Sequence, residues 1–299
     1  MRECPWFFVA LAAAWPAGPA AAQAPPGASE QAPIVVEGRR LNRETEIREL
    51  IDALPPAPSN GHLSRFEHEA CPAVIGVAPA QTAVIAARMR AVAAAAGVPV
   101  GRPACRPNVL IMVTSDKRQL IEQFARRYPG YFGDLTRRQI AALAESSEPA
   151  ALWHLSGAVD ADGRALFAHG GNVVVLRTTR AGSRIADQAH PEYIGSVLVI
   201  ESRALDGLTT TQLADYAAVR TFTGADPARL TDRSLSTILT LLYAPMGSAV
   251  PLTLTDWDLA FVRSLYRSDV NIHAPGQRGE IRDSMRRALE HAADADEHH

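Results

Sequence analysis

Residues 80–124 read AQTAVIAARMRAVAAAAGVPVGRPACRPNVLIMVTSDKRQLIEQF. Apolar side chains recur at helical spacing over residues 80–96, and residues 108–114 form an apolar run that is typical of a buried strand. A second helix is expected next, because Asp116 can cap it and apolar side chains line one face as far as Phe124. The positions of the other elements in the fold are predicted relative to this helix–strand–helix segment.

Upstream of this stretch we expect a strand over residues 62–68, so that the helix over 80–96 connects two strands. The length of that connection suits a crossover between parallel strands. Downstream, alternating and continuous apolar runs predict further elements. These are a helix over 136–145, a hairpin of strands 152–159 and 164–168 around the turn 160–163, strands over 172–178 and 195–202, and helices over 209–223, 231–243, 255–267 and 277–291.

Together these elements predict the α+β class, with a mixed β-sheet and crossover helices followed by a C-terminal helical subdomain. The clearest local signal in the C-terminal third is the pair Thr255 and Asp258, a capping-box pattern with Asp in place of Glu. We expect a single α+β domain over residues 61–292 and a disordered tail over 293–299.

The N-terminus has the pattern of a secretory signal peptide. Arg2 precedes an apolar stretch over residues 5–15, and a run of small residues follows. Cleavage after Ala22 starts the mature chain at Gln23, whereas cleavage after Ala24 would leave a proline directly behind the cut. An uncleaved anchor would need about 20 apolar residues. We therefore expect the first 22 residues to be removed and the protein to be periplasmic or secreted.

Residues 23–60 are rich in proline, and we expect them to be partly disordered. Their pattern allows a short strand over 34–38 and a helix over 41–54. The alternative is that the whole segment is a disordered tether. If the strand forms, it could be offered to the sheet of a partner protein.

The composition of the 299-residue, 32.1 kDa chain limits the classes of function. A hydrophobic fraction of 47% and a net charge of −2 exclude a chain that is disordered throughout. The same charge argues against nucleic-acid binding through bulk positive charge. No later apolar run reaches the length of a membrane span, so we expect no transmembrane segment in the mature chain. The expected partner is an unknown envelope protein or ligand.

Cys71 and Cys105 are the only cysteines that remain once the segment with Cys4 is removed. Two cysteines in an exported chain allow one intramolecular pairing. The helix between them is a crossover, which returns the chain beside the strand where it began. We therefore predict a Cys71–Cys105 disulfide, with a pair of unrelated thiols as the alternative.

Few side chains qualify as catalytic groups, and no G-x-S-x-G, P-loop or dinucleotide-binding motif occurs. Thr114 and Lys117, the only lysine, have the spacing of a nucleophile–lysine pair. Lys117 falls in the first turn of a predicted helix, however, where we expect a solvated cation. Glu201, at the end of an apolar strand, and Asp215, on the next helix, are the candidate pair of carboxylates for acid–base chemistry. The ordinary alternative is that both are surface or capping groups.

We expect no metal site and no cofactor. The Asp160-x-Asp162-Gly163 sequence resembles the start of a calcium loop, but no Glu stands at the twelfth position, so a hairpin turn explains it better. The nine histidines are scattered, and no two are four residues apart on a helix, as a helical zinc site requires.

An apolar strand over 197–200 leads into the helix over 209–223, and a later helix opens with residues 254–258, Leu-Thr-Asp-Trp-Asp, and closes with Leu265 and Tyr266. This order resembles that of metzincin-type zinc peptidases, in which an edge strand precedes an active-site helix that is broken at a glycine. It is also similar to an uncharacterised secreted proteobacterial family that keeps this layout. The resemblance covers the chain from Val197 to Ala288.

The resemblance implies a scaffold without zinc. With Gly224 on the glycine of H-E-x-x-H-x-x-G-x-x-H, Ala217 and Thr221 stand at the first two histidines, Ala218 at the catalytic glutamate and Pro227 at the third ligand. Every group that would bind zinc or activate water is replaced, which makes the scaffold degenerate. The alternative is that the later motif is only a well-capped helix.

These observations favour an exported soluble protein that acts by binding, as a non-catalytic accessory protein of the cell envelope. Its ligand is expected in a cleft between the sheet and the helical subdomain. The alternatives are an envelope hydrolase that uses carboxylates near Glu201 and a zinc-free, peptidase-like pseudoenzyme.

Overall fold

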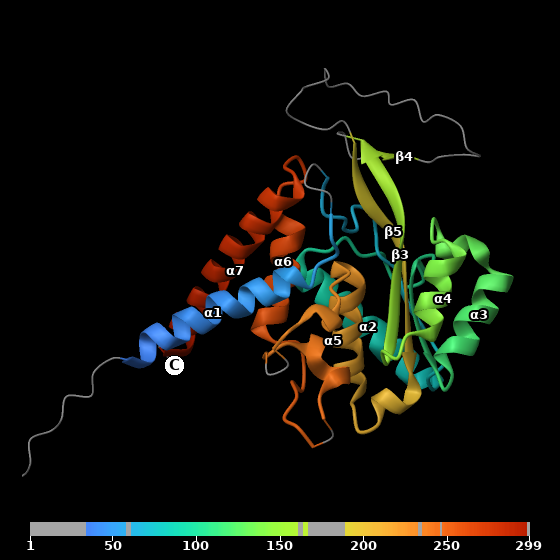
Figure 1. The fold of residues 1–299 in the computed structure, drawn as a ribbon, viewed down its shortest axis with the longest axis horizontal. Helices are drawn as coiled ribbons and strands as arrows, with labels where there is room; N and C mark the ends of the chain where they lie inside the picture. Colours follow the sequence, from blue (N-terminus) through green and yellow to red (C-terminus); the bar gives the residue numbers. More distant parts are fainter. Residues whose placement is uncertain are drawn as a thin grey trace, which may run out of the picture.

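A five-stranded mixed sheet in the order β1-β2-β5-β3-β4 forms the centre of the computed structural model (Figure 1). The structure describes residues 34–57, 61–160, 164–166, 189–232, 235–245 and 247–297. The strands are β1 (Pro72–Ile75), β2 (Val109–Thr114), β3 (Ala150–Asp160), β4 (Ala165–Leu166) and β5 (Ala189–Glu201). β1, β2 and β5 are parallel, whereas β3 is antiparallel to both β5 and β4. The predicted α+β class with a mixed sheet is confirmed.

The helix predicted over 80–96 is confirmed as α2 (Pro79–Ala96), and it joins the parallel strands β1 and β2, of which β1 was not predicted. The strand expected over residues 62–68 is wrong, because that segment contains no strand. It runs across the C-terminal helices instead, where the Arg65 guanidinium donates to the carbonyls of Leu265 and Ser268. Its polar side chains therefore hold helices together rather than lining a sheet.

β5 is an interior strand between β2 and β3. Every residue from 195 to 200 is buried, because helices cover both faces of the sheet. The edge-strand position that the resemblance gave to residues 197–200 is therefore wrong for β5. Among the described strands, β3 is the edge of the sheet along residues 150–157. The predicted pairing of β3 with β4 is confirmed, whereas residues 161–163 of their turn and the strand expected over 172–178 lie outside the described residues.

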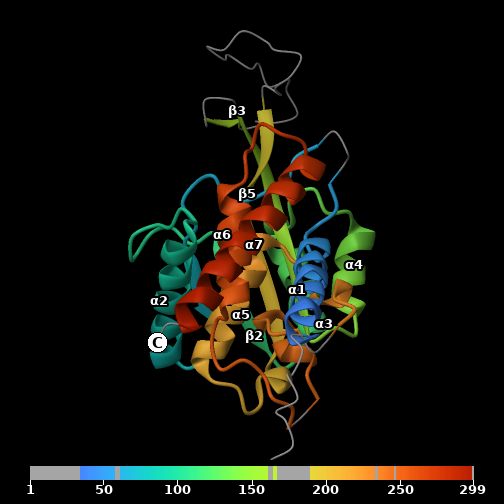
Figure 2. The same cartoon turned by 90° about the vertical axis from the view of Figure 1, so that its left-hand side faces the viewer.

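Helices cover both faces of the sheet (Figures 1 and 2). The smaller core lies against α3 (Lys117–Arg127), the short helix η1 (Pro129–Phe132) and α4 (Arg137–Glu145). The larger core lies on the other face, against α1 (Ile34–Asp52), α2, α5 (Thr210–Thr223), α6 (Asp256–Arg267) and α7 (Ala274–Glu297). Three further short 3₁₀-helices are η2 (Ser202–Leu205), η3 (Pro227–Arg229) and η4 (Ile238–Tyr243).

The N-terminal segment differs from its expected structure. The strand over 34–38 is wrong, since α1 begins at Ile34, and the edge strand for a partner's sheet is wrong with it. Ile47, Leu50 and Leu54 are buried in the larger core, and α1 packs along α7. The apolar face of this segment thus makes it part of the folded body rather than a tether.

The C-terminal third departs from the sequence pattern in two places. The helix expected over 231–243 is wrong. Among the described residues of this range, a 3₁₀-helix is present only over 238–243. The buried Asp258 carboxylate accepts from Thr237 and from the Ile238 amide and so fixes the backbone before this helix. The helix α7 extends through Glu297, so the disordered tail expected over 293–299 is wrong for residues 293–297. The capping box of Thr255 and Asp258 at α6 is confirmed.

The disulfide between Cys71 and Cys105 is present, with the two Cα atoms 6.0 Å apart. It connects the start of β1 to the loop that leads into β2, which is where the crossover places both cysteines. Among the described helices, none has the length and apolar character that a membrane span requires.

Candidate functional site

A groove of about 380 Å³ follows the edge of β3. The strand contributes Ala150, Ala151, Leu152 and His154 to it. The other walls are the end of α4 with the loop that follows it, the C-terminal end of α5, and the Pro55–Pro56 turn after α1. Three segments far apart in the sequence, residues 55–56, 143–154 and 220–229, therefore meet at this groove, between the two helical layers.

The edge of β3 is unpaired along the groove. Residues 150–157 pair with β5 on one side, and no other described strand pairs with them. Along an antiparallel pair, every second residue directs its backbone N–H and C=O to the partner strand, and the residues between direct theirs away from it. Because the Glu201 amide donates to the Pro149 carbonyl, the backbone groups of Ala150, Leu152 and His154 point away from β5, to the open side. The open edge ends at an irregularity between Leu155 and Ser156.

Helix α5 ends at Gly224, which lines the groove. Gly224 adopts the left-handed conformation, with φ of 71°, and caps the helix. A Cβ atom at this position would lie 2.7 Å from the Tyr193 hydroxyl and 2.9 Å from the Pro55 side chain. Glycine is thus required both by the backbone and by the close approach of the neighbouring segments.

A cluster of buried polar side chains lies beneath the groove. Arg220 is only 4% exposed and donates to the Ala225 carbonyl. Its Nη1 lies 3.9 Å from the Oδ1 of Asp226. Burial raises the pKa of Tyr216, and the adjacent Arg220 charge partly offsets that rise. Burial also raises the pKa of Tyr243, which hydrogen-bonds to Glu148. The cluster therefore combines both signs of charge with phenol groups that stay protonated at neutral pH.

His154 points from β3 towards α5. Its ring stacks on Tyr193 with 3.8 Å between the ring centres, and its Nε2 lies 2.9 Å from the Thr221 carbonyl. Because a carbonyl only accepts, Nε2 carries the proton of the neutral ring. Burial lowers the pKa of His154 to about 4, with the Thr221 carbonyl opposing the shift. The imidazole is therefore a neutral donor at physiological pH.

The two carboxylates proposed from the sequence have different partners. Asp215 is fully buried and accepts from Arg88 Nε and Nη2, from the Thr253 hydroxyl and from the Leu254 amide. Glu201 forms an ion pair with Arg203 at the surface. No hydrogen bond or ion pair joins the two carboxylates in the described part of the chain. Neither of them lines the groove along β3.

Lys117 is not the solvated cation that its position in the sequence predicted. It is 2% exposed, and its Nζ donates to the carbonyls of Ser146 at 2.7 Å and Glu148 at 2.5 Å. Burial lowers the pKa of Lys117, while the carboxylates of Glu201 and Glu148 oppose the shift. The ammonium group fixes the loop after α4 and so positions Glu148 at the groove.

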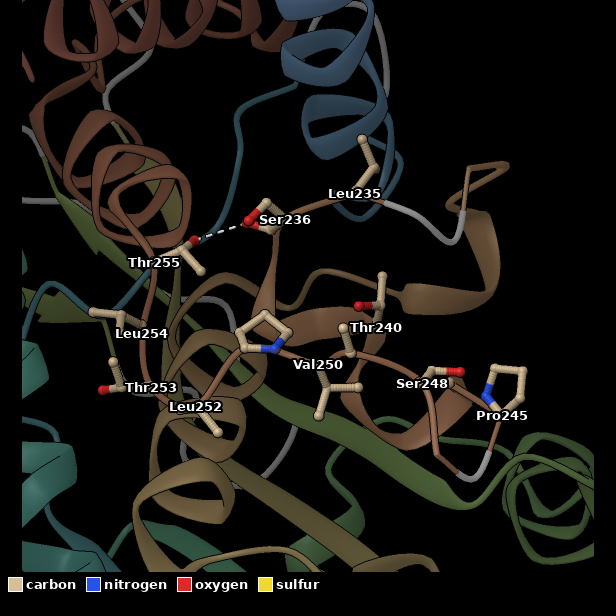
Figure 3. A pocket seen from close by; sticks show the side chains of 13 residues that line it. Leu235, Ser236, Thr240, Pro245, Ser248, Val250, Leu252, Thr253, Leu254 and Thr255 are labelled. Atoms are coloured by element: carbon tan, nitrogen blue, oxygen red, sulfur yellow. Dashed lines mark hydrogen bonds between the residues drawn. The ribbon is translucent and has the colours of Figure 1, made fainter. Parts of the chain in front are cut away.

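A second cavity, of about 670 Å³, lies between the segment around η4 and the loop before α6 (Figure 3). It is lined by apolar and hydroxyl side chains, and the Thr255 hydroxyl donates to the Ser236 carbonyl across it. None of the described residues that line this cavity has a titratable side chain, so they provide no acid, base or charged anchor. The groove along β3 is smaller but has the chemistry that orients a ligand.

Sequence reasoning missed the main groups of the groove. Glu148 and Arg220 were not singled out, although Arg220 is the one charged residue in the second half of the α5 sequence. A charge in a helix that is buried on all sides is the signal that could have identified it. Nothing in the sequence around Glu148 marks it.

The zinc positions implied by the resemblance lie on and just after α5. Ala217, Ala218 and Thr221 are buried, and Pro227 begins η3. In the described part of the chain, no group of three or more His, Cys, Asp or Glu side chains is arranged to hold a metal ion. No protein-family model, no curated protein and no solved structure matches this chain.

Proposed function

We propose that this chain is an exported, non-catalytic binding protein whose ligand is an extended polypeptide segment of a partner, bound along β3. The observation that carries the proposal is the coincidence of an unpaired strand edge with a groove. An added strand would satisfy the open backbone groups of Ala150, Leu152 and His154, while the groove accepts its side chains.

The sequence of this edge also lacks two of the usual protections against pairing. Edge strands are commonly shielded by proline, by charged side chains or by a covering element. The groove-lining part of β3 reads Ala-Ala-Leu-Trp-His, with no proline and no lysine, glutamate or aspartate. An edge of this kind is suited to recognising another extended chain.

The extracytoplasmic location rests on two observations. The signal-peptide pattern of the first 22 residues lies outside the described residues, but the Cys71–Cys105 disulfide suits an oxidising compartment. We place the protein in the periplasm or outside the cell, where its partner is an envelope protein.

The binding function is compatible with a zinc-free scaffold related to metzincins, which we propose as its origin. The chain passes from β5 through the short helix η2 into α5, which ends at Gly224, and this order supports the relationship. The hydrolase alternative has less support, because both oxygens of Asp215 are already engaged by neighbouring groups.

An outward amide of the strand edge can be removed by changing only one side chain of the groove, that of Leu152. In a Leu152→Pro variant the outward amide is lost, whereas the bonds of β3 to β5 come from the neighbouring residues. Leu152→Ala is the matched control, because it shortens the same side chain and keeps the amide. A random dodecapeptide library displayed on phage would be selected on the wild-type chain and on both variants.

We expect peptides to be enriched on the wild type and on Leu152→Ala, and not on Leu152→Pro. Circular dichroism would establish that all three proteins keep the same secondary structure and melt cooperatively. Equal enrichment on Leu152→Pro, or no enrichment on the wild type, would contradict the proposed function.

A further inference from the structure

The short helix η1 is flanked by exposed side chains that take no part in the groove. Tyr128 and Tyr131 are 47% and 40% exposed, which is unusual for large aromatic groups. Two arginines end α3 and two begin α4, and all four are exposed. Because α3 and α4 lie side by side on one face of the sheet, both arginine pairs border η1 (Figure 1). We call this set the η1 surface: Tyr128, Tyr131, Arg126, Arg127, Arg137 and Arg138.

The two exposed tyrosines are held on a packed aromatic base. The ring centre of Phe124 lies 5.5 Å from that of Tyr128 and 5.3 Å from that of Tyr131. Phe132 stacks on Trp153, whose indole donates to the Tyr131 carbonyl at 2.8 Å. Rings that are already fixed lose little conformational entropy when a partner packs on them. Tyrosine and arginine are also the residue types that carry much of the binding energy at protein interfaces.

The charge of this part of the chain is strongly positive. Residues 123–144 contain four arginines and one carboxylate, Asp134, and so carry a net charge of +3 in a chain whose net charge is −2. None of the four arginines forms an ion pair in the described part of the chain, whereas the neighbouring Arg118 pairs with Glu122 and Glu145. The positive charge of the η1 surface is therefore not neutralised from within the described structure.

Two of these arginines lie where a helix disfavours them. Arg137 and Arg138 occupy the first turn of α4, which contains no acidic residue. The positive end of the helix dipole makes cations unfavourable there, and α6 shows the usual arrangement, with Asp256 and Asp258 in its first turn. Local rules of this kind are typically broken at functional sites, so the pair suits a role in binding an anionic partner.

The η1 surface adjoins the open edge of β3. The Trp153 indole joins β3 to η1, and a Cβ atom on Gly133 would lie 3.9 Å from the Cα of Leu155, where the open edge ends. Helix α4 begins at this end and finishes at the groove, to which Leu143 contributes. A polypeptide that adds to β3 and continues past His154 therefore reaches the η1 surface.

We infer that the η1 surface binds an acidic segment of the partner polypeptide, continuous with the strand that adds to β3. The inference rests on the proposed function and narrows its ligand to a chain with carboxylates beyond one end of its strand. Guanidinium groups bind carboxylates through two parallel hydrogen bonds, and the net positive charge repels a basic segment. An anionic membrane would be attracted by the same charges, but it supplies no strand for the adjoining edge.

The test uses two hexapeptides, acetylated and amidated at their ends: Glu-Glu-Leu-Glu-Glu-Leu and its counterpart with glutamine in place of glutamate. The full chain labelled with ¹⁵N would be titrated with each by NMR. We expect the acidic peptide to shift the amides of residues 126–138 saturably, with a dissociation constant about tenfold below that of the glutamine peptide. The response should persist in Leu152→Pro, because it does not depend on the strand edge.

A charge reversal and a matched control make the test specific. Arg137→Glu with Arg138→Glu should weaken binding of the acidic peptide by about tenfold and remove its advantage over the glutamine peptide. Acidic residues suit the first turn of α4, so this variant should keep its fold. Arg102→Glu with Arg106→Glu removes the same charge from an exposed pair in the loop before β2, outside the η1 surface, and should leave the preference unchanged.

The outcomes separate this inference from the proposed function. Equal binding of the two peptides, or an equal loss in the control variant, would overturn the acidic-segment site while leaving strand addition to β3 intact. Phosphatidylglycerol vesicles that sediment with the wild type but not with the charge-reversed variant, without a peptide response, would overturn it in favour of a membrane. If the acidic peptide binds but the phage library is not enriched on the wild type, the proposed function fails and the acidic-segment site stands.

Discussion

His154 illustrates how a single residue couples the groove to pH. Its pKa is about 4 in the folded chain because of burial, against an ordinary value of 6.5. Between these values the unfolded chain binds a proton that the folded chain does not, so the stability contributed by neutral His154 is complete above pH 6.5 and is lost as the pH falls towards 4. We expect a loss on the order of 2 kcal/mol, somewhat below the full conversion of the shift because the ring keeps some exposure.

Urea unfolding at pH 7 and pH 4.5 would measure this loss in the wild type and in His154→Gln. The glutamine keeps a donor for the Thr221 carbonyl but cannot titrate. The pKa of His190 is also lowered by burial, so some pH dependence will remain in the variant. If both proteins lost the same free energy of unfolding, His154 would not be the group that titrates.

Asp215 and Glu201 should differ sharply in their effect on stability. Asp215→Ala leaves Arg88, Thr253 and the Leu254 amide without their acceptor, and we expect it to cost about 3 kcal/mol. Glu201→Ala breaks a surface ion pair and should cost less than about 1 kcal/mol. Denaturant unfolding of both variants checks this order, and equal losses would show that the burial of Asp215 has been misread.

At the scale of elements, the Cys71–Cys105 disulfide is the strongest local constraint. It closes a loop with a sequence separation of 34 that contains the whole of α2. By the chain-entropy estimate such a loop contributes about 3–4 kcal/mol, a large share of a typical stability of about 5–15 kcal/mol. Replacing both cysteines with serine should lower the melting temperature clearly, while circular dichroism should show the same fold.

Thiol counting on the exported protein, under denaturing and non-reducing conditions, provides the direct measurement. We expect no free thiol in the mature chain. Two free thiols per chain would mean that the cysteines lie close in space without being joined in the exported protein.

At the scale of the whole molecule, the central prediction concerns export. Mass spectrometry of periplasmic or secreted material should show a chain that begins at Gln23, because cleavage after Ala22 avoids a proline behind the cut. Recovery of a chain that begins at Met1 in the membrane fraction would contradict both the signal peptide and the proposed location.

The shape of the groove depends on how the helices pack on both faces of the sheet. Its walls come from the turn after α1, the loop after α4, the strand β3 and the end of α5. These segments are brought together because α1 and α5 share the larger core while α4 packs on the opposite face of the sheet. Changes to either core should therefore alter ligand binding even when they lie far from Arg220.

The sequence by itself determined the elements whose signals are local. Apolar periodicity and capping residues predicted α2, α3, α4, α5 and α6 close to their observed bounds, and continuous apolar runs predicted β2 and the second half of β5. The cysteine pairing was also predicted from the sequence, because a crossover returns the chain beside its starting strand, although that strand is β1 and not the one expected over 62–68. These features depend on neighbours within a few residues or on a simple rule of topology.

Only the tertiary structure decided the remaining features. The burial of Lys117 depends on two carbonyls some thirty residues away, and the extended backbone before η4 depends on the Asp258 carboxylate. The open edge of β3, and the meeting of Glu148 with Arg220, require the order of the strands and the packing of helices on both faces of the sheet. Local periodicity carries no information about such contacts, because the energy of burying a polar group is set by partners that the chain brings from a distance.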